Sequence, residues 1–563
     1  MPTKQINTET IFYAFAFILA LGLRFLNLGV APLSDSEAEF ALQAWDFSRG
    51  ALSQPSYFAL TRGIFFLLGS SSALARLWPA LSGSILVLIP SAFRSLLGRK
   101  AALILAFGLA LDPGLIAISR AAGSPMMAIA FIALALMMFY RKKPASGGVF
   151  SALALLSGPS IWIAFSGTLI FGLLLLNWDR NRIDGSNSTF PLTGMNKETI
   201  AISLKFGLAV YILVSTFAFS SSLGLGAFGG DAAAYFRGWA TPSGISPSRI
   251  IMALIMYMPL AVIFAFVIGI EHEEHQRLLV RKLALWAFAF LVVLMVYPGR
   301  QVVDAAWVLI PVWVLAAMGI SRYGNCTWQQ LVVWGQAAAQ FVVLILIWLI
   351  LAGSFHLIDE AQIIRITLFS GLLIFSSLTF IFVGLGWSWL AARQGLALGF
   401  GSALVVYSFA AVFGVSQVFP ANPAELWLPQ TSIGQEDLLL ETITDLSMRK
   451  TGQGNSLDGI ILIDSPALRW SLRDYQDIIF LPSLDTDQLA IPSVILALPA
   501  ESGTLLATAY RGQNFIWQMR ADTTGALPSN WESWLIFRES PLEVDEIVLW
   551  VHDDLFSLEP AGQ

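Results

Sequence analysis

The stretch PLSDSEAEFALQAW, residues 32–45, follows the first long apolar segment, residues 11–28, and carries three carboxylates. Asp35, Glu37 and Glu39 alternate with other residues just where the chain leaves that apolar segment. Ionisable groups in or beside a bilayer cost free energy, and they commonly mark a substrate pathway. The stretch therefore predicts a functional site at one surface of a membrane.

A helix start offers a second explanation for one of these carboxylates. Ser34 and Glu37 have the S-x-x-E spacing of a capping box, in which both side chains bind backbone N–H groups of the first helical turn. The helix that would follow has an apolar stripe made of Ala38, Ala41, Leu42 and Trp45. Glu37 is thus explained equally well as a cap or as a chemical group, whereas the cap does not need Asp35.

The composition places the whole chain in the membrane class. Of 563 residues, 56% are hydrophobic and only 12% are charged, and the mean hydropathy is +0.71. The net charge of −5 gives no reason to expect a nucleic-acid partner. The one cysteine, Cys326, excludes an internal disulfide and a cysteine metal cluster.

Apolar segments of membrane-spanning length recur along three quarters of the chain. A bilayer core needs about 20 apolar residues per helix. We expect about thirteen such helices, near residues 10–28, 75–93, 101–118, 124–140, 147–158, 160–176, 199–221, 249–270, 283–297, 304–320, 329–353, 363–385 and 395–418. The fold class that follows is an all-α polytopic membrane domain over residues 1–420, with a small α/β domain over residues 421–563.

Basic residues set the expected orientation, because cytoplasmic loops of membrane proteins are rich in lysine and arginine. They gather in alternate loops, at Arg94, Arg99, Lys100, Arg141, Lys142, Lys143, Arg180, Arg182, Arg277, Arg281, Lys282, Arg322 and Arg393. The N-terminus is then cytoplasmic, whereas residues 32–45 and the C-terminal domain lie outside the plasma membrane. Residues 147–176 have basic residues at both ends, so we expect two short helices that turn at residues 157–160.

The C-terminal region shows the pattern of a small sheet. Short apolar runs at residues 459–463, 478–481 and 493–499 predict buried strands, and residues 465–475 predict a helix between the first two. The region contains no glycine-rich phosphate loop and no grouping typical of a catalytic triad. Residues 271–275, EHEEH, lack the HExxH spacing of a zinc site, so a solvated helix end is the favoured interpretation.

Ionisable residues gather on the outer face in this topology. They are Asp35, Glu37, Glu39, Arg62, Arg76, Asp112, Arg120, Asp231, Arg237, Arg300 and Asp304. Carboxylates can accept a proton from a hydroxyl group or bind a divalent metal ion, whereas arginines bind phosphate. The presence of Arg76 at a helix end is also explained by an anchor in the lipid headgroups. For Arg120 and Arg300, a structural role and a role in substrate binding explain the sequence equally well.

Several motifs of the first 140 residues resemble one enzyme family. RFLNLGVAPLSDSEAEFALQAW, QPSYFALTRGIFFLLG, ARLWPALSGSILVL and LDPGLIAISRAAGSPMMAI look like the N-terminal half of the C-type (GT-C) membrane glycosyltransferases. The pattern is most similar to the branch of the protein mannosyltransferases and aminoarabinose transferases, and YPGRQVVDAAWVLIPVWVLAA resembles a later helix start of that branch. A weaker likeness links the C-terminal region to archaeal proteins associated with lipid-linked sugars.

The resemblance implies transfer of a sugar from a polyprenyl phosphate to a protein, lipid or glycan acceptor, outside the membrane and with inversion. The family's acidic pair falls on Asp35 and Glu37, with Ser36 inserted between them. Gln54 stands where the family has a histidine, and the second arginine of its S-R-x-A-R motif is replaced around Ser124. Substrate contacts are expected from Arg120, Arg300, Glu39, Arg62, Gln54, Tyr57 and Arg237.

Two roles stay open for Asp35 in the expected single displacement. It acts either as general base on the acceptor or, with Glu37 in support, as ligand to a divalent cation such as Mg²⁺ or Mn²⁺. Arg120 and Arg300 are expected to neutralise the leaving phosphate. The alternatives are a non-catalytic flippase-associated or transport protein for lipid-linked saccharides, and a scaffold for the C-terminal domain.

Overall fold

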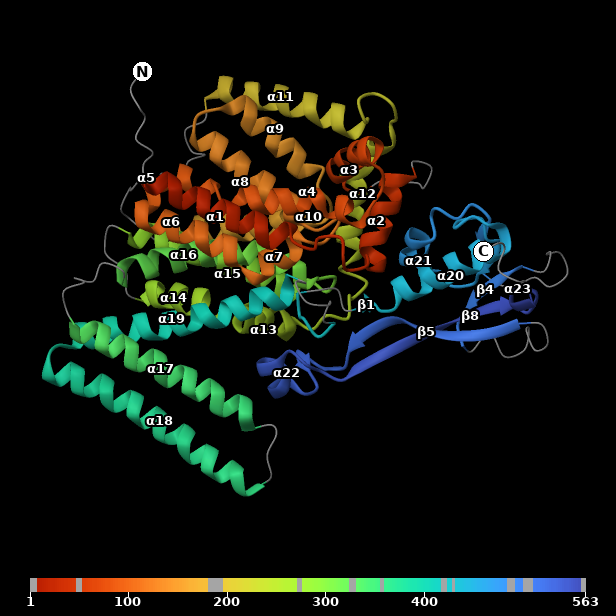
Figure 1. Ribbon diagram of the computed structural model, residues 1–563. Coiled ribbons are helices and arrows are strands. Elements are labelled where there is room, and N and C mark those ends of the chain that lie inside the picture. Colours follow the sequence, from red (N-terminus) through yellow and green to blue (C-terminus); the bar gives the residue numbers. More distant parts are fainter. Residues whose placement is uncertain are drawn as a thin grey trace, which may run out of the picture.

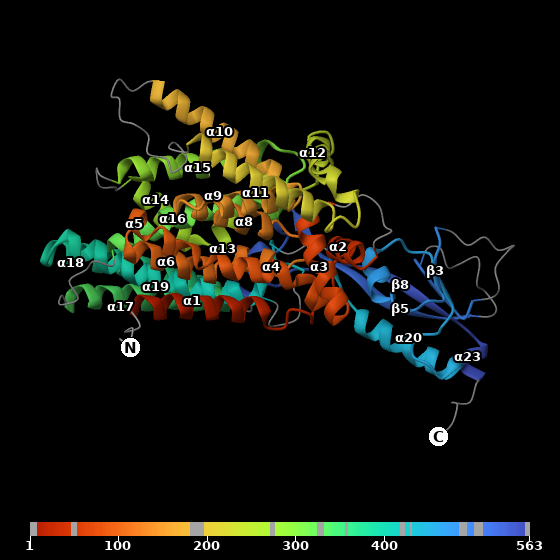
Figure 2. The same cartoon turned by 90° about the horizontal axis from the view of Figure 1, so that it is seen from above.

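Helices fill one end of the molecule and a sheet forms the other, as Figure 1 shows. The computed structural model describes residues 8–46, 53–180, 196–270, 276–323, 331–354, 359–416, 423–427, 431–482, 492–499 and 510–557. Seen from above in Figure 2, the helices of the bundle run along one direction, and the C-terminal sheet projects from one end of it. The segment EHEEH and Cys326 lie outside the described residues.

Nine stretches of the described chain are long and apolar enough to cross a membrane. The helices that form them are α1 (Thr8–Phe25), α4 (Ser72–Leu86), α10 (Ser160–Arg180), α11 (Lys197–Ser215), α15 (Arg277–Val296), α16 (Ala306–Tyr323), α17 (Leu331–Ser354), α18 (Asp359–Gly386) and α19 (Trp389–Val415). The chain is therefore a multi-pass membrane protein, as expected.

Two bent helix pairs are also long and apolar enough to cross a membrane when each pair is taken together, as a broken span or a re-entrant loop. α6 (Arg99–Leu111) and α7 (Pro113–Ser119) meet at 54°, and α13 (Pro247–Tyr257) and α14 (Pro259–Ile270) meet at 93°. In both pairs a proline opens the second helix, and a proline disfavours the helical conformation of the residue before it. Asp112, which precedes Pro113, accordingly has the extended angles φ −71° and ψ 117°.

The described residues therefore contain fewer membrane-spanning segments than the thirteen that we expected. Two of the expected segments form the shorter apolar helices α8 (Met126–Tyr140) and α9 (Pro144–Leu155), so the described chain has nine spans, or eleven with the bent pairs. Each of the thirteen expected segments is nevertheless helical. The expected turn at residues 157–160 is confirmed, because α9 ends at Leu155 and α10 begins at Ser160.

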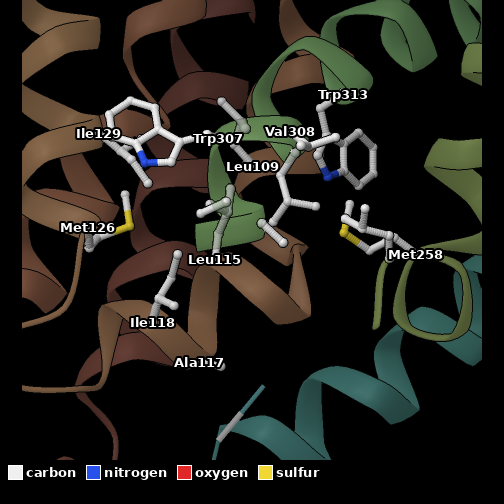
Figure 3. Packing of buried hydrophobic residues seen from close by; sticks show 14 of the residues in the cluster. Leu109, Leu115, Ala117, Ile118, Met126, Ile129, Met258, Trp307, Val308 and Trp313 are labelled. Atoms are coloured by element: carbon white, nitrogen blue, oxygen red, sulfur yellow. The ribbon is translucent and has the colours of Figure 1, made fainter. Parts of the chain in front are cut away.

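A large apolar core forms where α6, α7, α8 and α16 meet. Figure 3 shows Leu109, Leu115, Ile129 and Trp307 of this core, with Trp313 at its edge. The Trp313 Nε1–H donates to Oδ2 of Asp112 at 2.5 Å, so the buried carboxylate at the α6–α7 bend is hydrogen-bonded.

Short helices connect the spans at the end of the bundle that faces the sheet. Between α1 and α4 lie α2 (Asp35–Trp45) and α3 (Pro55–Leu68), and α12 (Ala227–Arg237) follows η2 (Leu223–Gly226). The remaining short elements of the membrane domain are η1 (Ile89–Ala92), α5 (Arg94–Leu97) and η3 (Val302–Ala305).

The C-terminal part forms the expected α/β domain around a six-stranded sheet with the order β1-β5-β8-β4-β2-β3. β2 pairs in parallel with β3 and β4, whereas β1, β5, β8 and β4 pair antiparallel. The main strands are β1 (Thr431–Ile433), β2 (Gly459–Ile461), β3 (Ile478–Phe480), β4 (Val494–Ala497), β5 (Tyr510–Ala521) and β8 (Leu542–His552). The other elements are α20 (Glu436–Thr451), α21 (Pro466–Ser471), β6 (Thr523–Thr524), β7 (Leu527–Pro528), α22 (Trp531–Phe537) and α23 (Asp554–Ser557).

The expected strands β2, β3 and β4 and the helix α21 are confirmed, but the two longest strands were missed. β5 and β8 expose most of their first residues and alternate weakly between apolar and polar residues, so periodicity gives little signal for them. The domain boundary expected at residue 420 stays a prediction, because residues 417–422 lie outside the described residues.

Close backbone packing joins α9 to α11. A Cβ atom added at Gly148 would lie 2.0 Å from the carbonyl oxygen of Ser203, and one at Gly207 would lie 3.0 Å from the carbonyl oxygen of Gly148. Small residues let membrane helices approach each other closely, and van der Waals packing then holds them together.

A single methyl group at this contact should loosen the pair. We expect Gly148→Ala to lower the free energy of unfolding by about 1–3 kcal/mol, because the added Cβ must push the helices apart. Thermal unfolding in detergent measures this. Gly172→Ala is the matched control, since no heavy atom lies within 4 Å of that Cβ position. Equal midpoints for the two variants would contradict the packing argument.

Candidate functional site

The helix α2 begins with the capping box expected from the sequence. Ser34 is the N-cap, and its Oγ accepts a hydrogen bond from the N–H of Glu37 at 3.4 Å. The N–H of Ser34 in turn donates to Oε2 of Glu37 at 3.1 Å. This cap sets the direction of α2 and leaves Asp35 as its first residue.

Glu37 also forms a buried ion pair with Arg76 of α4. Two parallel hydrogen bonds of 2.8 Å join the guanidinium to Oε1 and Oε2, and the residues are 6% and 2% exposed. The N–H of Ala122 donates to Oε1 at 2.9 Å. Burial opposes the charge, but Arg76 and the N–H groups of Ala122 and Ser34 hold the pKa of Glu37 below its usual value.

Arg76 ties the same group to the end of α1. Its remaining N–H groups donate to the carbonyl oxygens of Leu28, Ala31 and Pro32. The explanation of Arg76 as a headgroup anchor therefore does not hold, since the side chain is buried in protein. Glu37 and Arg76 together hold the turn between α1 and α2 in place.

The expected metal role does not fit Glu37. Its two oxygens accept five hydrogen bonds, which exceeds the roughly four acceptor positions of a carboxylate. Within the described residues, no group of three or more His, Cys, Asp or Glu side chains is placed to hold a metal ion. We therefore derive no step through a metal.

Asp35 faces the C-terminal domain. Its Oδ1 accepts hydrogen bonds from the Ser465 hydroxyl at 2.6 Å and from the Ala467 N–H at 3.0 Å, and its Oδ2 accepts one from Nε2 of Gln518 at 2.6 Å. The side chain stays partly accessible. Asp35 is thus placed where α2 meets the sheet domain, and Glu37 points the other way, into the membrane domain.

Arg120 caps the end of α1. Its two terminal nitrogens donate to four carbonyl oxygens, those of Leu23, Arg24, Leu26 and Asn27. Burial lowers the pKa of Arg120 to about 10, so the group stays charged at neutral pH. A cation at a helix C-terminus stabilises the macrodipole and the unpaired carbonyl groups.

Arg300 lies in the turn between α15 and η3. It donates to the carbonyl oxygens of Ile245 at 2.9 Å and Met295 at 3.3 Å, and its Nε is buried without a hydrogen-bond partner among the described residues. Arg249 of α13 is 6% exposed, and its Nε is also buried without a hydrogen-bond partner among the described residues. We did not predict Arg249 as a site residue, although a lone arginine in an apolar helix start is a signal for one.

Two of the remaining expected substrate residues have structural partners. Gln54, the left-handed residue before α3, donates to the carbonyl oxygen of Gly123 at 2.7 Å. The hydroxyl of Tyr57 donates to the carbonyl oxygen of Ala75 at 2.8 Å, and the ring is 2% exposed. Both side chains therefore hold α3 against neighbouring loops and α4.

Arg62 lines a cavity of about 590 Å³ between α2, α3 and the end of α11. The other lining residues are mainly apolar, and they include Trp45, Phe65, Phe66, Leu213 and Phe217. Glu39 and Arg237 are exposed on α2 and α12. Asp35, Glu37, Arg62 and Arg120 thus all lie on or next to α1 to α4, and among the described residues no hydrogen bond or ion pair joins Arg300 to any of them.

Comparison with known proteins identifies the architecture. No family model matches the chain, and no curated protein matches it. Its backbone is similar to that of ArnT from Cupriavidus metallidurans in the structure bound to undecaprenyl phosphate, with a TM-score of 0.53 over 97% of this chain and 98% of that chain at 13% sequence identity. The apo structure of the same protein gives a TM-score of 0.52 with the same coverage and identity. The chain has the C-type glycosyltransferase fold.

The Glu37–Arg76 pair should be essential for stability. Breaking a buried pair leaves an uncompensated charge, so we expect Glu37→Gln to lower the free energy of unfolding by about 3–5 kcal/mol. The measurement is thermal or denaturant unfolding in detergent. The control is Asp545→Asn, which breaks a half-exposed pair with Arg520 and should cost less than about 1 kcal/mol. Similar losses in both variants would show that burial is not the cause.

Asp231 of α12 should make the stability depend on pH. It is 2% exposed, its Oδ2 has no hydrogen-bond partner among the described residues, and burial raises its pKa to about 7. The folded state then keeps a proton that the unfolded state loses near pH 4, so stability falls as pH rises between about 4 and 7. We expect Asp231→Asn to raise the melting temperature more at pH 8 than at pH 5. An equal gain at both pH values would contradict this.

Proposed function

We propose that the chain is an integral-membrane glycosyltransferase that takes its sugar from a polyprenyl phosphate on the extracytoplasmic face. The observation that carries the proposal is the placement of Asp35 in the C-type fold. It is a partly accessible carboxylate at the start of α2, fixed by hydrogen bonds and next to the outer ends of α1 to α4. A general base needs this combination of access and fixed direction.

The proposed reaction is a single displacement with Asp35 as general base. An acceptor oxygen or nitrogen attacks the anomeric carbon, its proton passes to the Asp35 carboxylate, and the bond from the anomeric carbon to the phosphate oxygen breaks. The sugar is transferred with inversion and the polyprenyl phosphate is released. Glu37 has no direct part in this step, because Arg76 and three N–H or O–H groups already occupy it.

We assign phosphate binding to arginines in which one buried N–H group has no hydrogen-bond partner among the described residues. The buried Nε atoms of Arg249 and Arg300 lack partners among the described residues, and an anionic oxygen would satisfy such donors. Arg120, the other expected phosphate ligand, meets the same criterion, because its Nε is also buried without a partner among the described residues. Its terminal nitrogens donate to the carbonyl groups of α1, as those of Arg300 donate to Ile245 and Met295, so Arg120 also fixes the position of α1.

The lipid donor has a suitable environment. The cavity beside Arg62 has apolar walls, as a prenyl chain requires, and ArnT, which shares the fold, has been crystallised with undecaprenyl phosphate. The large exposed side chains of α17 and α18 are mostly apolar, as contact with lipid requires.

Replacement of Asp35 tests the proposal directly. The purified protein in lipid nanodiscs is incubated with undecaprenyl-phosphate hexose and pentose donors and with a serine-rich peptide, a glycolipid and an oligosaccharide as acceptors. We expect Asp35→Asn to reduce transfer at least about 100-fold, because general-base catalysis contributes that much. Glu441→Gln, which changes an exposed carboxylate of α20 that has no assigned role, should keep normal activity.

Two outcomes would contradict the assignment. Equal turnover by wild type and Asp35→Asn would remove Asp35 from the chemistry. No transfer by wild type with any of these donors would favour the non-catalytic, flippase-associated alternative.

A further inference from the structure

The contact between Asp35 and the C-terminal domain is built from three donors on two elements. The Ser465 hydroxyl and the Ala467 N–H come from the start of α21, and the Gln518 amide comes from β5. All three donors point at one carboxylate that lies more than 400 residues earlier in the chain. Three hydrogen bonds hold a carboxylate in one orientation, whereas a side chain without such bonds at a helix end populates several rotamers.

Ser465 can only act as a donor toward Asp35. Its Oγ accepts hydrogen bonds from the Leu468 N–H at 3.3 Å and from Nε1 of Trp517 at 3.4 Å. Two N–H groups thus occupy the lone pairs of the hydroxyl, and its one hydrogen is left for the carboxylate. The buried indole of Trp517 therefore fixes the polarity of the Ser465–Asp35 bond.

A β-bulge precedes Gln518. In the ladder between β5 and β8, Ile516 is opposite Glu546 and Gln518 is opposite Asp545, so Trp517 is an extra residue on β5. Bulges redirect side chains and are frequent beside active sites. Here the bulge accompanies a buried Trp517 and the bond from Gln518 to Asp35.

The contact leaves Asp35 available for chemistry. A carboxylate has roughly four acceptor positions. Among the described residues, Oδ1 accepts two hydrogen bonds and Oδ2 accepts one, which leaves one acceptor position on Oδ2. This is the arrangement of an oriented base, in contrast to Glu37, whose oxygens are fully occupied.

Further contacts that do not involve Asp35 join the same two surfaces. Trp470 of α21 packs against Phe65 of α3 and donates to Oγ of Ser72 at 3.2 Å. Arg473 donates to Oγ of Ser70 at 3.2 Å and stacks over the ring of Trp470. Buried side chains of α2 and α3 belong to the same apolar cluster as the core of the C-terminal domain.

We propose that the C-terminal domain completes the catalytic site, with Ser465 and Gln518 as positioning residues that hold Asp35 in its reactive direction. This inference rests on the proposed function. It gives the domain a defined task, which is to fix the base from the side opposite the membrane domain.

The test uses the full-length protein in nanodiscs, with the undecaprenyl-phosphate donors and acceptors of the transfer assay. We expect Gln518→Leu and Ser465→Ala to lower kcat about 10-fold or more, because each removes a hydrogen bond to a charged group. The KM for the donor should stay within about twofold, since neither residue is assigned to the donor. Ser465→Thr keeps the hydroxyl and should restore kcat.

A matched control separates positioning from general loosening of the interface. Ser72→Ala removes the hydrogen bond from Trp470 across the same interface and does not touch Asp35. It should leave kcat unchanged. An equal loss of kcat in Ser72→Ala, or normal kcat in both Gln518→Leu and Ser465→Ala, would overturn the inference while the proposed function stands.

Hydrogen exchange tests the contact without turnover. The Ala467 N–H donates to Asp35, so Asp35→Ala should increase its exchange rate about 10-fold or more, while amides of α20, none of which is shown to donate to Asp35, keep their rates. Unchanged exchange at Ala467 would overturn the inference. If wild type transfers no sugar from any donor, the proposed function fails and the catalytic role of Ser465 and Gln518 fails with it.

Discussion

The buried ion pair between Glu37 and Arg76 is the interaction on which the end of the membrane domain that faces the sheet depends. Arg76 of α4 binds Glu37 of α2 and the carbonyl groups that follow α1, and Glu37 binds the N–H of Ala122 before α8. Four chain segments thus meet at one pair of charges. Burying two charges is costly unless every donor and acceptor is used, and here the neighbouring backbone groups supply those partners. The pair fixes the residue at which α2 begins, and it thereby fixes the position of Asp35.

Asp35 and Glu37, the two carboxylates of the D-S-E sequence, therefore have different roles. Because Ser36 stands between them, Asp35 and Glu37 leave the helix start in different directions. Glu37 faces the membrane domain and Asp35 faces the sheet domain. Ser36 itself is exposed. Residues two apart on an α-helix leave its axis about 200° apart, so one acidic residue serves the fold while the other stays accessible.

The sequence predicted the elements better than their contacts. Apolar length identified each helical segment, but Pro113 and Pro259 bend two of the spans, and α8 and α9 are too short to cross alone. The capping box at Ser34 and Glu37 is a local pattern, and it was predicted. The partners of Glu37 and Asp35 come from distant segments, so no spacing along the chain could indicate Arg76, Ser465 or Gln518. The arginines show the same limit, since residue type alone did not reveal that Arg120 caps α1 and that Arg249 keeps an unused donor.

The sheet order has a consequence for how the protein is made. β8, the last strand of the described chain, lies between β5 and β4, and β5 carries Gln518. β5 cannot pair with β8 until residues 542–552 have been synthesised, by which time the described membrane helices, the last of which ends at Val415, have all been synthesised. Contacts of such long sequence separation form late in folding. A nascent chain that lacks residues 542–552 therefore already contains Asp35 and its helix, while the sheet that presents Gln518 to that carboxylate is still incomplete.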